Sequence, residues 1–253
     1  MSTINIDGMS IYYISKNYRQ DKYPLIFIHG AGNTSYTWYN QISITGPNYY
    51  PLALDLPGHG RSNGDGYSEI EKYSEFMYSF INTLGFEHVV LSGHSMGGAI
   101  VQDFALRYPS KLKKAILIGT GAKLRVAKEV LENTKKGYSY SHYAYSPKTD
   151  KELINLAEKE FSLTDPMVRY NDFIACDNFN VMDKIKMINT DTLIIVGRDD
   201  QLTPVKYAEF LNREIKNSEL KIIDDAGHNV MWEKPEEVNL TIKSFLEEEN
   251  NGK

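Results

Sequence analysis

Cysteine is nearly absent from this chain of 253 residues. The single cysteine, Cys176, excludes an intramolecular disulfide and fits a reducing compartment. Long hydrophobic runs are also missing, and none approaches the roughly 18 apolar residues of a membrane-spanning helix. The N-terminus has neither the basic stretch nor the apolar run of a signal peptide. These absences favour a cytoplasmic protein with no membrane as a partner.

Clusters of basic residues are lacking as well. Lys and Arg number 28 against 33 Asp and Glu, which gives a net charge of −5 at pH 7 and a pI of about 5.7. This weakly acidic balance gives no reason to expect nucleic acid as a partner. The sequence also has no Cys-x-x-Cys pair, no two histidines spaced as metal ligands on one helix, and no Walker-type loop. We therefore expect no metal and no cofactor.

Short, continuous apolar runs recur along the chain and predict strands that are buried on both faces, as in a parallel sheet. They cover Pro24–Ile28, Tyr49–Leu54, His88–Leu91, Ala115–Ile118, Thr192–Val196 and Leu220–Ile223. An edge hairpin is expected over residues 3–15. Helical periodicity separates several of these runs, at residues 70–84, 100–108 and 238–246. The alternation predicts the α/β class, with a doubly wound and mostly parallel sheet.

The segment 122–186 interrupts this alternation because it contains helical patterns and no strand-like run. Helices are expected over Lys123–Lys135, Asp150–Phe161 and Pro166–Cys176. We expect a core domain made of residues 1–121 and 187–253, with residues 122–186 inserted as a helical cap. Such a cap would lie over the carboxyl edge of the sheet, where open α/β sheets bind ligands.

The central chemical motif is Gly93-His94-Ser95-Met96-Gly97, which follows one predicted strand and opens onto a predicted helix. This is the setting of a nucleophile elbow, a sharp turn that exposes a serine hydroxyl. The glycines on either side leave room for the strained turn. The alternative is a glycine-rich turn with an incidental serine. The strand-to-helix context favours Ser95 as a nucleophile.

A serine hydroxyl needs a neighbouring base to take its proton. Of the six histidines, His228 directly follows the last predicted strand, so it lies at the same edge of the sheet as Ser95. A triad in the chain order Ser, Asp, His places its base at that point. The acid should then follow an intervening strand, where Asp199 and Asp200 both qualify.

Several motifs together resemble the α/β-hydrolase superfamily, from one end of the chain nearly to the other. They are His29-Gly30-Ala31-Gly32, Asp55-Leu56-Pro57-Gly58-His59-Gly60-Arg61-Ser62, the Gly93–Gly97 elbow, Gly197-Arg198-Asp199-Asp200 with Pro204, and Gly227-His228. The resemblance implies that Asp200 is the acid, because it follows the glycine by three residues and precedes the proline by four. It also implies an oxyanion hole made of the backbone N–H groups of Ala31 and Met96.

The resemblance implies a serine hydrolase, in first place a carboxylesterase that cleaves small to medium esters through an acyl-enzyme on Ser95. Alternatives within the same fold are a carbon–carbon bond hydrolase, a thioesterase or lactonase, and a proline aminopeptidase. A small-molecule receptor that retains the triad is a different class of function. The expected partner is a small-molecule ester, and the chain is expected to be a monomer or a homodimer.

Tyrosines gather in the expected cap at Tyr138, Tyr140, Tyr143 and Tyr145. They could line an apolar pocket over Ser95, or they could pack the cap onto the main domain. Both interpretations stay open on the sequence alone. The segment from Leu56 to Ser62 and His29 are expected to shape the site rather than react.

Overall fold

The computed structural model describes residues 2–16, 21–44, 48–136 and 143–247 of the chain. These residues form one sheet of eight strands in the order β1-β2-β4-β3-β5-β6-β7-β8. The strands are β1 (Ser2–Ile6), β2 (Met9–Ser15), β3 (Tyr23–Ile28), β4 (Tyr49–Leu54), β5 (Val89–His94), β6 (Leu112–Ile118), β7 (Thr192–Gly197) and β8 (Ser218–Ile223). Only the pairings of β2 with β1 and with β4 are antiparallel. The prediction of a doubly wound, mostly parallel α/β sheet is confirmed.

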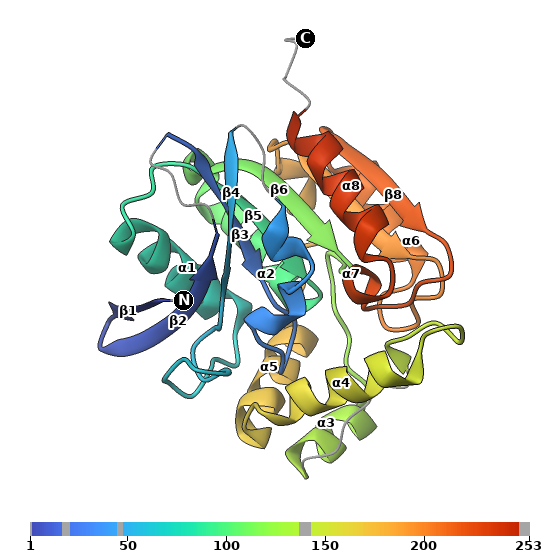
Figure 1. Ribbon diagram of the computed structural model, residues 1–253. Coiled ribbons are helices and arrows are strands. Elements are labelled where there is room, and N and C mark those ends of the chain that lie inside the picture. The colour runs from blue at the N-terminus through green and yellow to red at the C-terminus, as the bar shows by residue number, and fades with distance from the viewer. Residues whose placement is uncertain (1, 17–20, 45–47, 137–142, 248–253) are drawn as a thin grey trace.

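Helices cover both faces of this sheet (Figure 1). They are α1 (Ile70–Thr83), α2 (Met96–Arg107), α3 (Lys128–Lys135), α4 (Lys151–Ser162), α5 (Pro166–Asn178), α6 (Val205–Glu214), α7 (Val230–Glu233) and α8 (Pro235–Glu247). None of the described helices is long and apolar enough to cross a membrane.

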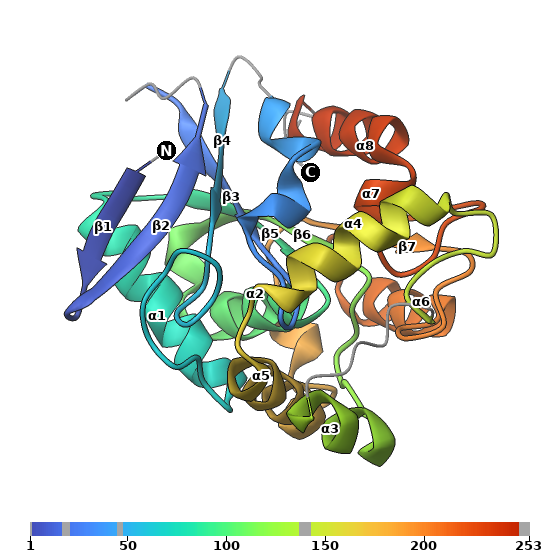
Figure 2. The same ribbon diagram turned by 60° about the horizontal axis from the view of Figure 1, so that its bottom comes forward.

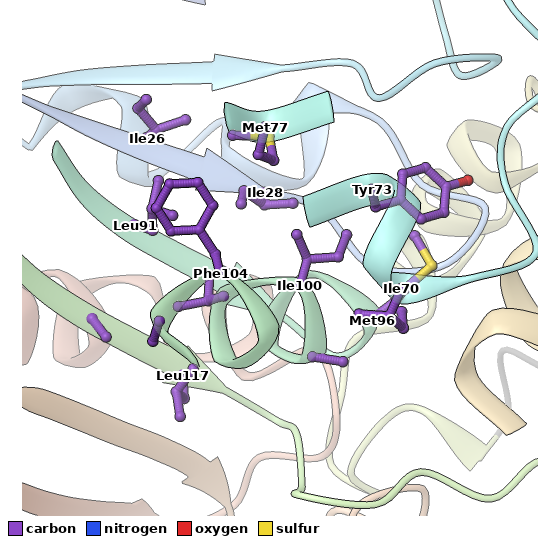
Figure 3. Packing of buried hydrophobic residues seen from close by; sticks show 14 of the residues in the cluster. Ile26, Ile28, Ile70, Tyr73, Met77, Leu91, Met96, Ile100, Phe104 and Leu117 are labelled. Carbon is purple, nitrogen blue, oxygen red and sulfur yellow. The ribbon is translucent and has the colours of Figure 1, made fainter. Parts of the chain in front are cut away.

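The continuous apolar runs become central strands because alternate side chains enter two separate cores. Ile26 and Ile28 of β3 pack into the cluster that contains residues of α1 and α2. Leu25 and Phe27 of the same strand pack into the cluster that contains residues of α8. Figure 3 shows the first cluster, with Phe104 of α2 between the sheet and the helices. A strand with a core on each side must be apolar at every position, which explains the absence of alternation.

Helices α3, α4 and α5 all belong to residues 122–186, which we call the helical insertion. Figures 1 and 2 show these helices grouped at one end of the sheet, the end at which the parallel strands finish. Helix α3 begins at Lys128, so the expectation of a helix from Lys123 is wrong for its first turn. Lys123 instead forms an isolated antiparallel bridge with Asn180, which holds this stretch extended.

Helix α6, between β7 and β8, was not anticipated from the sequence. Only Ala208 and Leu211 of this helix are buried. Val205 and Phe210 are partly buried against the same core, so the apolar positions of this short helix span less than two turns, too short a stretch for the period to be recognised. The helix completes the alternation of strands and helices along the carboxyl-terminal half of the sheet.

Candidate active site

Ser95 lies at the turn between β5 and α2, with backbone angles φ 53° and ψ −114°. Positive φ is strained for a residue other than glycine and persists only where its surroundings fix it. The neighbouring glycines have no space for a side chain: a Cβ on Gly93 would lie 2.1 Å from the Gly97 carbonyl oxygen, and one on Gly97 would lie 2.3 Å from the Ile28 oxygen. The Ser95 N–H donates to the Ile118 oxygen at 2.9 Å, which ties the turn to the next strand.

Asp200 and His228, which follow β7 and β8, meet at the same edge of the sheet. Nδ1 of His228 lies 2.9 Å from Oδ2 of Asp200. The Thr203 hydroxyl donates to the same oxygen at 2.8 Å, and the N–H groups of Leu202 and Thr203 donate to Oδ1 at 2.9 and 2.8 Å. Because a carboxylate accepts, Nδ1 of His228 carries the proton and Nε2 is left free to act as a base.

The electrostatics of Asp200 favour the charged form although only 4% of the residue is exposed. Burial alone would raise the pKa of its carboxyl. The attraction of His228 and the hydrogen bonds from His228 and Thr203 outweigh burial, so the pKa lies below its ordinary value. An ionised Asp200 can therefore stabilise positive charge on His228.

Asp199, the other candidate acid, turns to a different partner. Its Oδ2 accepts the Ser146 hydroxyl at 2.6 Å, from a residue of the helical insertion. It does not cap helix α6, whose N-cap is Pro204. Of the two adjacent aspartates, the structure thus brings Asp200 to His228 and Asp199 to the helical insertion.

His94, inside the elbow, contacts His228 through its backbone and its ring. Its Nε2 donates to the carbonyl oxygen of His228 at 3.0 Å, and the two rings lie 4.7 Å apart. Burial and the nearby His228 lower the pKa of His94 to about 3, so its imidazole is neutral. A neutral ring beside His228 adds no repulsion when His228 takes a proton.

The loop after β3 carries Ala31 close to the elbow. A Cβ on Gly30 would lie 3.3 Å from Cβ of Ser95, so the two segments are in direct contact. Ala31 is 9% exposed and faces the same cavity as Ser95. Met96 is the first residue of α2, and its N–H therefore has no acceptor within the helix. The two residues expected to supply the oxyanion donors thus adjoin Ser95, Met96 as the next residue and Ala31 through the contact of Gly30.

A cavity of about 340 Å³ opens over these residues. Residues outside the helical insertion form part of its wall, among them Ala31, Ser95, Leu202 and His228. The helical insertion contributes Leu124, Arg125, Val126, Val130, Tyr143, Tyr145, Glu158, Phe161, Phe173 and Cys176. The lining is mainly apolar. Within the described part of the chain, no group of three or more His, Cys, Asp or Glu side chains is arranged to hold a metal ion.

Of the four tyrosines singled out in the sequence, Tyr143 and Tyr145 line the cavity. Tyr145 is 4% exposed, so it is also packed within the protein, while Tyr143 is 46% exposed. Tyr138 and Tyr140 lie outside the described residues. Tyr145 thus both lines the cavity and packs inside the protein, and a role in binding substrate stays a prediction.

His29 is buried and links two loops of the site. Its Nδ1 donates to the Gly30 oxygen at 2.9 Å, and its Nε2 accepts the Leu56 N–H at 3.0 Å. Burial and the neighbouring His59 lower the pKa of His29 well below its ordinary value. A neutral histidine with both nitrogens in use shapes the loop.

Two acidic residues near the site were not predicted from the sequence. Asp172 of α5 is fully buried and accepts hydrogen bonds from the loop of Ala31 and from His59 and Tyr73. Glu233 of α7 accepts the N–H groups of Gly227 and Ser146. The available signal for Asp172 was an acid among Val168, Ala175 and Cys176 on one face of a predicted helix, a face that also carries Arg169.

Comparisons with known proteins all point to the same family. Residues 25–239 match the model of the Alpha/beta hydrolase family. A solved thermophilic esterase is 33% identical, with 97% of this chain and 96% of that chain covered and a TM-score of 0.84. A lipase-esterase related protein from Clostridium acetobutylicum is 30% identical, with 93% and 99% covered and a TM-score of 0.81. A 2-hydroxy-6-oxononadienedioate/2-hydroxy-6-oxononatrienedioate hydrolase from Comamonas testosteroni is 26% identical, over 96% of this chain and 94% of that protein.

Proposed function

Because this chain belongs to the alpha/beta hydrolase family, we propose that it is a serine hydrolase that cleaves carboxylic esters through an acyl-enzyme on Ser95. The observation that carries the proposal is the 2.9 Å contact between His228 and an ionised Asp200, in a site where His228 and Ser95 line one cavity. A buried, oriented histidine that shares a cavity with a strained serine supports the activation of that hydroxyl.

In the proposed first step, the Ser95 hydroxyl proton passes to Nε2 of His228 while Oγ bonds to the ester carbonyl carbon. The backbone N–H groups of Ala31 and Met96 receive the oxyanion, a contribution of about 3 kcal/mol per donor. The protonated His228 then gives its proton to the departing alkoxide, which leaves as an alcohol. The acyl group remains on Ser95.

In the second step, water gives a proton to the same nitrogen of His228 and attacks the acyl carbon. The acid is released and the proton returns to Ser95. Residues 122–186 act as a cap over this reaction, since their side chains form one wall of the cavity. Excluding bulk water strengthens the hydrogen bonds to the oxyanion.

The cavity supports a neutral, medium-sized ester. A volume of about 340 Å³ suits a small ligand, and the wall formed by the helical insertion is mostly aliphatic and aromatic. Burying a charged group of the substrate against this wall would cost several kcal/mol unless that group were paired. The acyl or alcohol part that contacts Leu124, Val130 and Phe173 is therefore uncharged.

A second candidate is the hydrolysis of a carbon–carbon bond. The hydrolase from C. testosteroni that this chain resembles suggests it. Its named substrate is a dioate, and Arg125 in the cavity wall is a cation that a carboxylate could approach. However, Arg125 is 64% exposed and lies 3.9 Å from Asp177. An exposed cation that already has an anionic neighbour gives a weaker case than the apolar wall.

The experiment is the release of p-nitrophenol from acetate, butyrate and octanoate esters, with Ser95→Ala as the control. Continuous turnover that depends on Ser95 would support the ester hydrolase, and the chain-length profile would measure the pocket. A single burst without turnover would favour a receptor that retains the triad. Failure on all three esters together with turnover of 2-hydroxy-6-oxononadienedioate would favour the second candidate.

A further inference from the structure

Asp172 is a fully buried carboxylate at the contact between the helical insertion and the core domain. Its Oδ2 accepts the Gly32 N–H and lies 2.7 Å from Nε2 of His59, and its Oδ1 accepts the Tyr73 hydroxyl at 2.5 Å. The Gly32 bond is also 2.7 Å long. A fully buried carboxylate needs such donors to remain charged. All three come from the core domain.

Gly32 directly follows Ala31, the proposed donor to the oxyanion. It has φ +69°, and the helical insertion leaves it no room for a side chain. A Cβ on Gly32 would lie 2.5 Å from Cε2 of Phe161 and 2.8 Å from Cγ of Arg169. Thus α4 and α5 pack directly against the loop that carries Ala31. Asp172 holds this loop by accepting the backbone N–H of Gly32.

The Gly32 N–H belongs to the peptide plane that joins Ala31 to Gly32. The short hydrogen bond that the Gly32 N–H donates to a charged acceptor restrains that plane, and the plane in turn restrains the orientation of Ala31. Oxyanion donors act only when they are aimed before the charge develops. Functional groups must be held within about 0.5 Å of the productive geometry to be effective.

The negative charge of Asp172 is balanced locally. Burial alone would lower the pKa of His59, but the attraction and hydrogen bond of Asp172 outweigh it and raise the pKa. Nδ1 of His59 lies 3.0 Å from the Pro57 carbonyl oxygen and Nε2 lies 2.7 Å from the Asp172 carboxylate, so both ring nitrogens face acceptors. A ring that donates from both nitrogens is protonated, and it leaves the pair neutral. The anchor therefore orients the loop without opposing the oxyanion that forms nearby.

Tyr73 reaches Asp172 from helix α1. In Figure 3 its ring lies beside Ile70 and its hydroxyl points away from the labelled apolar side chains. The hydroxyl also accepts the Tyr67 N–H at 3.0 Å, so it is held from both sides. Asp172 consequently sits against groups that are themselves fixed.

We propose that Asp172 is a positioning residue that holds the Ala31 N–H in the orientation that binds the oxyanion, so that the helical insertion completes the catalytic site as well as covering it. This inference rests on the proposed function at Ser95. It makes docking of the insertion and formation of the oxyanion hole one event. Nothing in this role requires Asp172 to touch the substrate.

The test replaces Asp172 by Asn, which keeps the shape but turns an amide N–H₂ toward one of the donors. We expect kcat for p-nitrophenyl butyrate to fall by about 10- to 100-fold, less than the loss of a whole oxyanion donor, and KM to change by less than about threefold. The matched control is Asp165→Asn, the same change at the exposed N-cap of the same helix. Asparagine caps a helix as well as aspartate does, so this variant should keep wild-type kinetics.

A second readout follows Ser95 directly. The Ser95 oxygen bonds to the phosphorus of a fluorophosphonate probe while its proton passes to His228 and fluoride leaves. The phosphoryl oxygen then takes the place of the oxyanion. The rate of labelling should fall in Asp172→Asn by a factor similar to that of kcat. A Tyr73→Phe variant removes one donor to Asp172 but leaves the Gly32 contact, and its melting temperature serves as the reference for destabilisation alone.

The outcomes separate the two proposals. Unchanged kcat and labelling in Asp172→Asn would overturn the positioning role, and so would an equal loss of kcat in Tyr73→Phe at equal melting temperature. If the wild type is labelled at Ser95 but cleaves no ester, slower labelling of Asp172→Asn would uphold the positioning role while the ester assignment fails. If wild-type Ser95 is not labelled at all, both proposals fail together.

Discussion

The Ser146 hydroxyl donates to Oδ2 of Asp199 at 2.6 Å, while Oδ2 of the neighbouring Asp200 accepts a hydrogen bond from Nδ1 of His228 at 2.9 Å. The two aspartates are adjacent in the chain, yet one holds the helical insertion and the other orients the proposed base. Their side chains leave the backbone in different directions, and this separates two roles that the sequence alone left close together.

Replacing each aspartate by asparagine should therefore give very different enzymes. In Asp200→Asn an amide faces Nδ1 of His228, which selects the wrong tautomer, and we expect kcat to fall on the order of 10³–10⁴-fold. In Asp199→Asn the side-chain oxygen can still accept the Ser146 hydroxyl, and the change should be within about threefold. Steady-state hydrolysis of p-nitrophenyl butyrate measures both. The reverse ranking would show that Asp199 is the acid.

The strained backbone of Ser95 gives a prediction about stability. Ser95→Ala and Ser95→Gly should both lose on the order of 10³–10⁶ in kcat, because each removes the nucleophile. They should differ in stability, since glycine adopts φ 53° without steric cost. We expect Ser95→Gly to be the more stable of the two by about 1 kcal/mol in urea unfolding. A less stable Ser95→Gly would mean that the turn stores no strain.

The sheet and the local part of the site were accessible from the sequence because their signals are contiguous. A strand between two cores is apolar at every position, and the elbow glycines are required by contacts within a few residues of Ser95 or with the adjacent strand. The motif order then brings Ser95, Asp200 and His228 to the carboxyl edge. The family assignment follows from the same motifs.

The contacts of the helical insertion were not accessible in this way. Asp172 meets Gly32, His59 and Tyr73 at separations of 140, 113 and 99 residues, and no local spacing encodes such pairs. Its surroundings on α5 gave only a hint, since it shares a buried face with Val168 and Cys176. The first turn expected in α3 failed for a similar reason, because a bridge to distant Asn180 overrides the local helical pattern.

Glu233 links the loop of His228 to the helical insertion. Its Oε2 accepts the Gly227 N–H at 2.9 Å and its Oε1 accepts the Ser146 N–H at 2.8 Å. In Glu233→Gln the amide nitrogen cannot accept, so one of these N–H groups loses its partner. We expect the free energy of unfolding to fall by about 1–3 kcal/mol, with a smaller kcat because His228 follows Gly227.

The control for this change is Glu236→Gln, an exposed position in the first turn of α8. It removes the same charge without touching the loop and should alter stability by no more than about 0.5 kcal/mol. Urea unfolding and ester hydrolysis compare the two variants. Equal behaviour would mean that Glu233 does not secure the loop.

His94 should make the protein sensitive to acid. Its pKa is about 3 in the folded state, against roughly 6.5 for an unfolded histidine. The unfolded chain therefore binds a proton that the folded chain does not, and stability falls as the pH decreases through this window. The expected slope is about 1.4 kcal/mol per pH unit from this one residue.

In His94→Gln the amide can still donate to the His228 carbonyl oxygen, but it does not titrate. We expect the free energy of urea unfolding between pH 6 and 4.5 to decrease less steeply than in the wild type. The difference in slope should correspond to the uptake of about one proton on unfolding. His29 keeps its own contribution in the same direction in both proteins, because its pKa is also lowered by burial. Working above pH 4.5 avoids the protonation of Asp200, whose lowered pKa removes stability only at more acidic pH. Parallel slopes in the two proteins would show that folded His94 takes up its proton as readily as an unfolded histidine does.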